Sequence, residues 1–356
     1  MVDTTLENPL GTDGFEFVEF TSPEPEKMAR TFELLGFTAF AKHPTKDVIR
    51  YKQGDINVLL NRETTGQAAR FRADHGPSAN GMAFRVKAAK KAFELAIERG
   101  AKPTDAAPGA LGVGSYVLEG IGGSLLYLVD QYGEKGSVYD SWEQIPGAAE
   151  AEAKNSMGLQ LLDHLTHNVR RGQMRTWSSF YNQVFNFTEQ KYFDIKGKAT
   201  GLFSQAMIAP DRMIRIPLNE SQDDKSQIEE YLRQYNGEGI QHLAFTTPDI
   251  YATVEKMKAN GVVFQDTIET YYELVDKRVP GHGEDLARMK KNRILIDGSE
   301  EEGLLLQIFT ENLFGPIFFE IIQRKGNEGF GNGNFQALFE SIELDQIRRG
   351  VIKVEG

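Results

Sequence analysis

Four segments of the sequence repeat one plan, in which a short apolar run is followed by an amphipathic run. They occupy residues 14–37, 81–100, 162–187 and 239–261. In each segment the second run has apolar residues at i, i+3, i+4 and i+7 and ends at Gly or Asn, which is typical of an α-helix and its C-terminal stop. The chain is therefore expected to contain four copies of one strand–helix unit.

Short alternating runs lie between these units, at residues 47–61, 115–130 and 213–219. Their length and period of two are typical of half-buried strands, several of them joined as hairpins. One helix followed by about three strands, four times over, describes paired βαβββ modules. The sequence thus predicts an α+β fold with two domains, each an open β-barrel built from two such modules.

The length of 356 residues suits two domains of roughly 150 residues each. The stretch from Gln144 to Asn155 is rich in Pro, Ala and Glu, so we place the boundary there. The expected units are an N-terminal domain, residues 1–150, and a C-terminal domain, residues 151–356. A glycine-rich stretch at 326–335 precedes a predicted helix from about Phe335 to Arg349, either a hinged lid capped by Asn334 or a packed terminal helix.

Composition excludes several classes of partner. The net charge of −11, with no basic cluster, argues against nucleic acid. No cysteine is present, which excludes disulfides and thiolate metal sites and fits a reducing compartment. The N-terminus has no signal-peptide pattern, and the apolar runs are shorter than the roughly 20 residues of a membrane helix. We therefore expect a cytoplasmic protein without membrane or nucleic-acid partners.

Two histidines and one carboxylate stand on three of the predicted strands. His164 and His242 begin equivalent runs, and Glu320 lies within the apolar run PIFFEIIQR. Two imidazoles and a carboxylate are the ligand set of a facial iron(II) site. Each histidine could instead be a hydrogen-bonded core residue, and Glu320 could pair with Arg324 or a backbone amide, because leaving it unpaired would cost several kcal/mol. Strand alternation directs His167 away from His164 and makes it an unlikely ligand.

The repeats can be aligned at their helix ends, and LLYLV can be aligned with LLQIF. This register places Gly14, Gly81 and Asp140 opposite His164, His242 and Glu320, respectively. The first domain would then lack metal ligands and serve as a structural partner to a catalytic second domain.

Several neutral polar residues accompany the three candidate ligands. Gln241 adjoins His242, Gln307 lies in LLLQIF, and Ser204 and Asn219 lie on other strand-like runs. Polar residues on strands are more often surface groups, but facing inward they would offer hydrogen bonds to a polar ligand.

The segments LDHLTHNV, GEGIQHLAF, LLLQIF, FFEIIQRKG and GFGNGNFQALFESIE resemble signature segments of the 4-hydroxyphenylpyruvate dioxygenase family, within the vicinal oxygen chelate superfamily. The resemblance is dense over residues 160–350 and continues into the first half, in GFEFVEF and HGPSANGMAFRVK. It implies one Fe(II) per subunit, held by His164, His242 and Glu320. It also implies catalytic roles for Gln241, Gln307 and Asn334. The substrate contacts that it implies are Ser204, Pro217, Asn219, Gln227, Phe309, Phe330 and Phe335. No role is assigned to residues 266–300.

The implied reaction converts 4-hydroxyphenylpyruvate and O₂ into homogentisate and CO₂ by oxidative decarboxylation, ring hydroxylation and side-chain migration. Family members form homodimers or homotetramers, so the same is expected here. One alternative is 4-hydroxymandelate synthase, which resembles the sequence in fold and ligands, although Pro217, Asn219 and Phe335 favour the dioxygenase. Others are an extradiol catechol dioxygenase and a metal-free module that binds an aromatic ligand.

Overall fold

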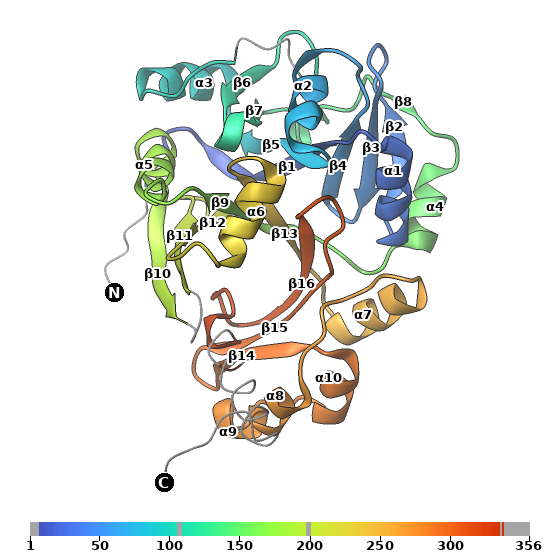
Figure 1. Ribbon diagram of the computed structural model, residues 1–356. Helices are drawn as coiled ribbons and strands as arrows, with labels where there is room; N and C mark the ends of the chain where they lie inside the picture. The colour runs from blue at the N-terminus through green and yellow to red at the C-terminus, as the bar shows by residue number, and fades with distance from the viewer. Residues whose placement is uncertain (1–6, 105–108, 197–200, 335–336, 338–356) are drawn as a thin grey trace.

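The computed structural model of the protein describes residues 7–104, 109–196, 201–334 and 337. Two eight-stranded sheets dominate it, the first (blue to cyan in Figure 1) lying above the second (green to red). The first sheet has the order β6 (Tyr116–Glu119), β7 (Leu125–Val129), β5 (Ser78–Val86), β1 (Thr12–Thr21), β4 (Ile56–Asn61), β3 (Val48–Gln53), β2 (Thr38–Lys42), β8 (Glu143–Gln144).

The second sheet repeats this plan. Its order is β10 (Thr188–Lys196), β11 (Gly201–Ile208), β12 (Arg215–Ser221), β9 (Leu162–Val169), β13 (Gly239–Thr246), β16 (Phe318–Lys325), β15 (Gly303–Phe309), β14 (Leu295–Ser299). In both sheets two modules meet at a central antiparallel pair, β1–β5 or β9–β13. Parallel partners flank each central pair. The predicted fold of paired βαβββ modules is thus confirmed. In the second module the strand that follows the helix, the counterpart of β2, is reduced within the described residues to a bridge between Pro103 and Leu118.

The four predicted helices are α1 (Pro25–Leu34), α3 (Ala89–Glu98), α5 (Met174–Phe185) and α7 (Ile250–Ala259). Their ends follow the expected signals, because α5 stops at Asn186 in the left-handed conformation and Asp249 caps α7 by accepting a hydrogen bond from the Ala252 amide. Within the part of the chain that the structure describes, six further helices occur that the sequence does not predict: α2 (Gly66–His75), α4 (Ala148–Asn155), α6 (Gln227–Tyr235), α8 (Glu269–Glu273), α9 (Val275–Arg278) and α10 (Leu286–Asn292). Short 3-10 turns occupy Ile121–Gly123 and Gly133–Lys135.

The stretch that composition marks as a domain boundary contains helix α4, whose Glu152 accepts a hydrogen bond from the Gly54 amide. One local expectation needs correction. Residues 332–334 are already helical, so Asn334 lies within a helical turn and is not its N-cap. Phe335 and most of the predicted terminal helix lie outside the described residues.

Strand pairing also corrects the register between the two halves. Ala244 pairs with His164 on one side and Glu320 on the other, and its counterpart Ala83 pairs with Phe17 and Tyr127. The first sheet therefore has Phe17 and Tyr127 where Gly14 and Asp140 were expected, whereas Gly81 opposite His242 is unchanged. Alignment at helix ends failed because α5 has 12 residues and α1 has 10, and because α5 also begins later after its strand, ten positions after His164 against eight after Phe17. LLYLV is β7, the counterpart of β16 and not of β15.

The two sheets share one aromatic core. Phe20 of the first sheet contacts Phe319 of the second and Phe314 in the connection before β16, with ring centroids 6.3 and 5.5 Å apart, respectively. Phe37 meets Phe245 edge-on at 5.7 Å. These rings are almost fully buried, so the contact anchors the second sheet on a rigid base. No helix within the described ranges is long and apolar enough to cross a bilayer.

Candidate metal centre and active-site cavity

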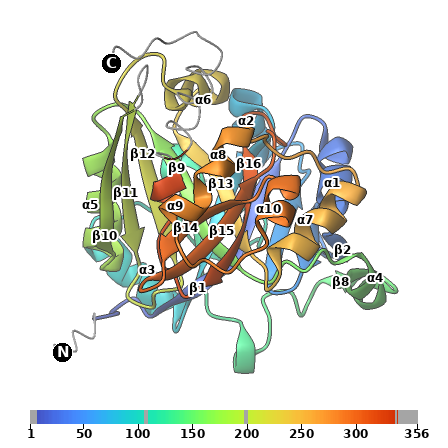
Figure 2. The same ribbon diagram turned by 90° about the horizontal axis from the view of Figure 1, so that it is seen from below.

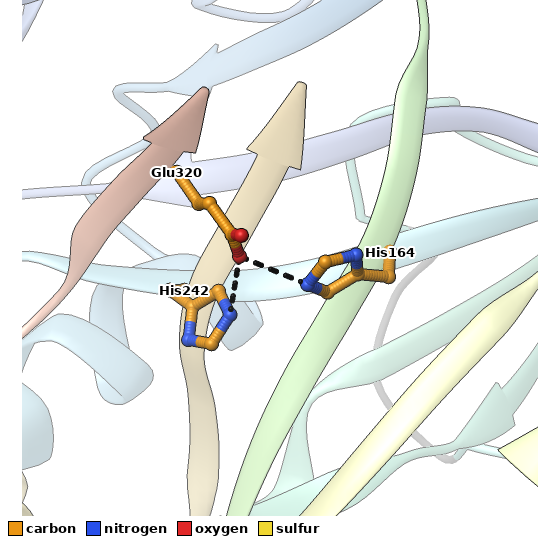
Figure 3. Close-up of side chains that lie close together, drawn as sticks. All are labelled: His164, His242 and Glu320. Carbon is orange, nitrogen blue, oxygen red and sulfur yellow. Dashed lines mark ion pairs between the residues drawn. The ribbon is translucent and has the colours of Figure 1, made fainter. Parts of the chain in front are cut away.

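Three adjacent strands of the second sheet bring His164, His242 and Glu320 together (Figure 3). His164 lies on β9, His242 on β13 and Glu320 on β16. In this register Ala244 is the direct neighbour of both His164 and Glu320, and its small side chain leaves room between them. The strands therefore direct all three side chains to one point on one face of the sheet.

The ligand atoms have the spacing that one ion requires. Glu320 Oε2 lies 3.1 Å from His164 Nε2 and 3.3 Å from His242 Nε2. Ligand atoms about 2.1 Å from a shared ion, at right angles to one another, are separated by about 3 Å. Within the described residues, this is the cluster of His, Asp and Glu side chains that could hold a metal ion. The spacing fits the facial arrangement of two histidines and one carboxylate.

The hydrogen bonds behind the two imidazoles fix which nitrogen of each ring faces Glu320 and the space between the three side chains. His164 Nδ1 donates to Asp163 Oδ2 at 2.8 Å, and His242 Nδ1 donates to Gln241 Oε1 at 2.9 Å. With the proton on Nδ1, each neutral ring presents the lone pair of Nε2. Two lone pairs and a carboxylate oxygen then converge, which requires a cation or an added proton between them. The residues present therefore fit a divalent metal ion.

Arg324 pairs with Asp163 and not with Glu320. Its Nε and Nη2 donate to Asp163 Oδ1 and Oδ2 at 2.9 and 2.7 Å. Burial alone would raise the Asp163 pKa, but the hydrogen bonds from Arg324 and His164 outweigh it and hold that pKa well below its usual range. The purely structural explanation of Glu320, an ion pair with Arg324, is therefore removed.

In the metal-free protein the added proton resides on His164 and keeps Glu320 ionised. Burial opposes the Glu320 charge, but the positive charge of His164 and the hydrogen bonds with both histidines lower the Glu320 pKa to about 2. The same Glu320 charge raises the pKa of His164 against the effect of burial, whereas burial dominates at His242 and lowers its pKa. The second oxygen, Oε1, accepts a hydrogen bond from Gln307 Nε2 at 3.0 Å.

Gln241 and His242 both line the cavity although they are consecutive on one strand. Alternation would send them to opposite faces. The pairing of β13 with β9 shifts register between Ile240 and His242, and this irregularity turns both side chains to the same side. His167 follows the predicted alternation, is fully buried elsewhere and bonds to the Tyr181 hydroxyl at 2.7 Å.

A cavity of about 320 Å³ opens in front of the three ligand atoms. The structure brings every sequence-predicted site residue that it describes to this cavity. They are His164, His242, Glu320, Gln241, Gln307, Asn334, Ser204, Pro217, Asn219, Gln227, Phe309 and Phe330. Phe335, the remaining candidate, lies outside the described residues. Ser204 on β11 pairs with Asn219 on β12. Both side chains are half-buried and line the cavity, so they point inward.

Aromatic rings surround the ligands. Phe330 lies edge-on to His164 with ring centroids 5.3 Å apart, and Phe309 lies edge-on to His242 at 6.3 Å. Phe318 stacks on His242 at 4.9 Å and was not singled out in the sequence. The sequence signal that could have identified Phe318 is its position directly before the FEII segment. In the structure Phe318 pairs with His242 across the parallel strands β13 and β16.

Thr166 and Asp163 were also missed as site residues. Thr166 Oγ1 lies 3.0 Å from His242 Nε2. Thr166 comes two positions after His164 on β9, and both side chains point from the same face of the strand into the cavity. Asp163 acts from the opposite side of the strand by holding His164 Nδ1. Strand alternation identified the face of Thr166, but no sequence pattern could show that an adjacent aspartate would bend towards the neighbouring ring.

Comparisons with known proteins agree with this site. Residues 6–142 match the N-terminal family of hydroxyphenylpyruvate dioxygenase, and residues 161–274 match the glyoxalase, bleomycin resistance protein and dioxygenase superfamily. The chain is 55% identical over 99% of each chain to hemolysin VllY of Vibrio vulnificus. A solved mutant of 4-hydroxymandelate synthase from Streptomyces coelicolor has the same fold, with a TM-score of 0.80 and 24% identity over 94% of this chain and 99% of that one.

Sequence identity over nearly the full length is the clearest sign of the family to which the chain belongs. The chain is 59% identical to a 4-hydroxyphenylpyruvate dioxygenase of Pseudomonas aeruginosa over 97% of each chain. The family motifs, the paired modules and the two-histidine, one-carboxylate cluster all occur in one polypeptide. This chain belongs to the 4-hydroxyphenylpyruvate dioxygenase family.

Proposed function

We propose that the protein is an iron(II)-dependent dioxygenase that converts 4-hydroxyphenylpyruvate and O₂ into homogentisate and CO₂. The observation that carries this proposal is the convergence of His164 Nε2, His242 Nε2 and Glu320 Oε2 at the cavity, in a chain of this family. The family relationship supports the reaction, and the ligand set supports iron as the metal.

Bound by these three ligands, iron(II) would supply the activation of O₂ and a site for the 2-oxo acid group. The protein's own contribution is to keep the ligands in one protonation state. Asp163 and Gln241 hold the two imidazole protons on Nδ1, and Gln307 occupies one oxygen of Glu320. The side of the three ligand atoms that faces away from the strands opens into the cavity.

The cavity combines apolar walls with neutral amides. Phe309 and Phe330 are placed to pack against an aromatic ring and exclude water from it. Gln241, Gln307 and Asn334 are the proposed catalytic amides, because each lines the cavity within the hydrogen-bond network of the ligands. Neutral groups suit this task, since they can orient a phenol or a 2-oxo acid without adding a competing charge.

A second group of residues is proposed to contact the substrate further from the ligands. Ser204, Pro217 and Asn219 lie on two neighbouring strands, and Gln227 opens helix α6. All four line the cavity. We extend the same role to Phe335 on the family resemblance alone.

We further propose that residues 1–150 form a structural domain and residues 151–356 the catalytic one. The counterparts of the three ligands in the first half are Phe17, Gly81 and Tyr127, which cannot form the same site. The protein is proposed to be cytoplasmic and to form homodimers or homotetramers, as the family resemblance implies.

Product analysis tests the reaction. The protein is loaded with Fe(II) and 4-hydroxyphenylpyruvate without oxygen and then exposed to air. Homogentisate and an equal amount of CO₂ are expected. Appearance of 4-hydroxymandelate in place of homogentisate would make the protein a synthase of that acid. Binding without any CO₂ release would leave only a ligand-binding module.

A further inference from the structure

A chain of hydrogen bonds runs from helix α9 to the metal-binding carboxylate. Arg278 Nη2 donates to the Tyr271 hydroxyl at 2.7 Å, and that hydroxyl donates to Asn334 Oδ1 at 2.7 Å. Asn334 Nδ2 donates to Gln307 Oε1 at 2.8 Å, and Gln307 Nε2 donates to Glu320 Oε1 at 3.0 Å. Five side chains thus connect the α8–α9 segment, beside β14 in Figures 1 and 2, with Glu320.

The two ends of this chain determine its direction. A guanidinium group can only donate, and a carboxylate can only accept. The Tyr271 hydroxyl accepts from Arg278 and from the Ile296 amide at 2.9 Å, and its single proton has two acceptors within reach, Asn334 Oδ1 at 2.7 Å and the Ile296 carbonyl at 3.2 Å. The Ile296 carbonyl already accepts from Arg278 at 2.6 Å, so the proton is directed to the nearer Asn334 Oδ1, to which Arg278 Nη2 also donates at 3.3 Å. The Asn334 amino group must then face Gln307, and the Gln307 amino group must face Glu320.

The direction matters at the metal centre because it decides which Glu320 oxygen is free. Gln307 occupies Oε1, and Oε2 is the atom that lies near both histidine Nε2 atoms. If the Gln307 amide turned over, its oxygen would face the carboxylate and repel it. Both carboxylate oxygens could then move, and the defined spacing of the three ligand atoms would be lost.

Arg278 also holds the backbone beside Asn334. Its Nη1 lies 3.7 Å from Asp297 Oδ1, and Asp297 Oδ2 accepts a hydrogen bond from the Gly333 amide at 2.8 Å. Arg278 Nη2 donates in addition to the Ile296 carbonyl at 2.6 Å. The arginine therefore joins the α8–α9 segment, β14 and the chain that carries Asn334 in one network.

We propose that Tyr271 and Arg278 are positioning residues that orient the Asn334 and Gln307 amides and thereby fix Glu320 for metal binding. This inference rests on the proposed metal centre and assigns a role to the segment 266–300. Neither residue lines the cavity, so both act through other side chains. Gln307 is the direct partner of Glu320, and such partners typically change metal affinity by about 10- to 100-fold, so a misoriented Gln307 amide should be visible in binding of the metal alone.

The neighbouring residue provides a matched control. Tyr271 and Tyr272 are consecutive in α8, and both are at least 98% buried. The Tyr272 hydroxyl takes no part in the chain to Glu320. Replacing either tyrosine with phenylalanine removes one buried hydroxyl from the same helix, but only Tyr271→Phe removes the proton directed to Asn334.

Titration of the metal-free full-length protein with Co(II), followed by its visible absorption, tests the proposal. Tyr271→Phe is expected to raise the Co(II) dissociation constant by roughly tenfold, and Tyr272→Phe by less than about twofold. A lower unfolding temperature of Tyr271→Phe with a wild-type dissociation constant would show a purely structural role and overturn the proposal. Equal weakening by the two variants would do the same.

Arg278 gives an independent test should Tyr271→Phe not fold. Arg278→Lys keeps a donor-only cation and should retain most of the affinity, whereas Arg278→Met should weaken Co(II) binding by roughly tenfold. Wild-type affinity in Arg278→Met would refute the proposal. Failure of the metal centre itself would look different, because the wild-type protein and His164→Ala would then have the same Co(II) titration.

Discussion

Arg324 donates two parallel hydrogen bonds to Asp163, from Nε to Oδ1 at 2.9 Å and from Nη2 to Oδ2 at 2.7 Å. Asp163 is in turn the acceptor for His164 Nδ1. The arginine also donates to the carbonyls of Asn327 and Gly329, at 2.9 and 2.7 Å. One side chain therefore connects a proposed metal ligand, His164, with the chain segment that carries Phe330 into the cavity.

Asp163→Asn should weaken iron binding by about 10- to 100-fold. An amide can still accept from His164 Nδ1, but it presents an amino group to Arg324 and loses the charge that satisfies the guanidinium. Equilibrium dialysis against Fe(II) measures the effect. Asp224→Asn, at an exposed aspartate paired with Arg171, is the control and should bind iron as the wild type does. Equal iron affinity in the two variants would contradict the role of Asp163.

His164→Ala, His242→Ala and Glu320→Ala should each reduce turnover to below roughly a hundredth of the wild-type rate. Each substitution removes one of three ligand atoms and leaves two others that cannot hold the ion in a facial arrangement. Elemental analysis should find less iron in all three, and circular dichroism should find an unchanged fold. His43→Ala in the first half of the chain serves as the control. Near-normal turnover in any of the three variants would exclude that residue as a ligand.

The sequence predicted the parts of this protein that depend on local periodicity. The runs around His164 and His242 became β9 and β13, and the helices that follow them ended at the predicted residues. The hydrophobic pattern alone is sufficient to predict these strands and helices, because the spacing of the apolar residues has to match a buried face. The family motifs then identified the cavity residues, which the described structure places around one cavity.

The parts that were missed depend on contacts between distant segments. The sequence indicates no role for the α8–α9 segment, because the proposed role of Tyr271 depends on its contact with Asn334, 63 positions further along the chain. The pairing of Gln241 with His242 depends on a register irregularity that follows from the neighbouring strand. The sequence pattern aligns Glu320 with Asp140, because the apolar runs of β15 and β16 are interchangeable by pattern and only strand pairing separates them.

Glu255 and Arg288 should make stability depend on pH in acid. Arg288 and Asn292 both donate to the Glu255 carboxylate, at 2.8–2.9 Å, and lower its pKa to about 2 from an ordinary 4.5. A carboxyl group with a lowered folded-state pKa stabilises the protein above pH 4.5, and that stabilisation is lost as the pH falls towards 2.

Urea unfolding of the wild type and of Glu255→Gln at pH 7, 4 and 3 measures this contribution. The difference in the free energy of unfolding should be largest at pH 7 and shrink at the two lower values. Because both side chains are more than a third exposed, the difference should be small and should fall further in high salt. A difference that stays constant with pH would contradict the assignment.

Gly331→Ala should lower enzymatic activity without unfolding the protein. A Cβ atom on Gly331 would lie 1.5 Å from Gln307 Oε1, so Gln307 would have to leave its place between Asn334 and Glu320. Gly66→Ala is the matched control, because Gly66 has a similar positive φ, +80° against +74°, but no atom within 4 Å of the added Cβ. Both variants carry the backbone strain of about 1 kcal/mol that a left-handed alanine costs. Only Gly331→Ala should lose activity, by roughly tenfold or more, through a displaced amide. Equal activity in the two variants would show that Gln307 is not needed where the structure places it.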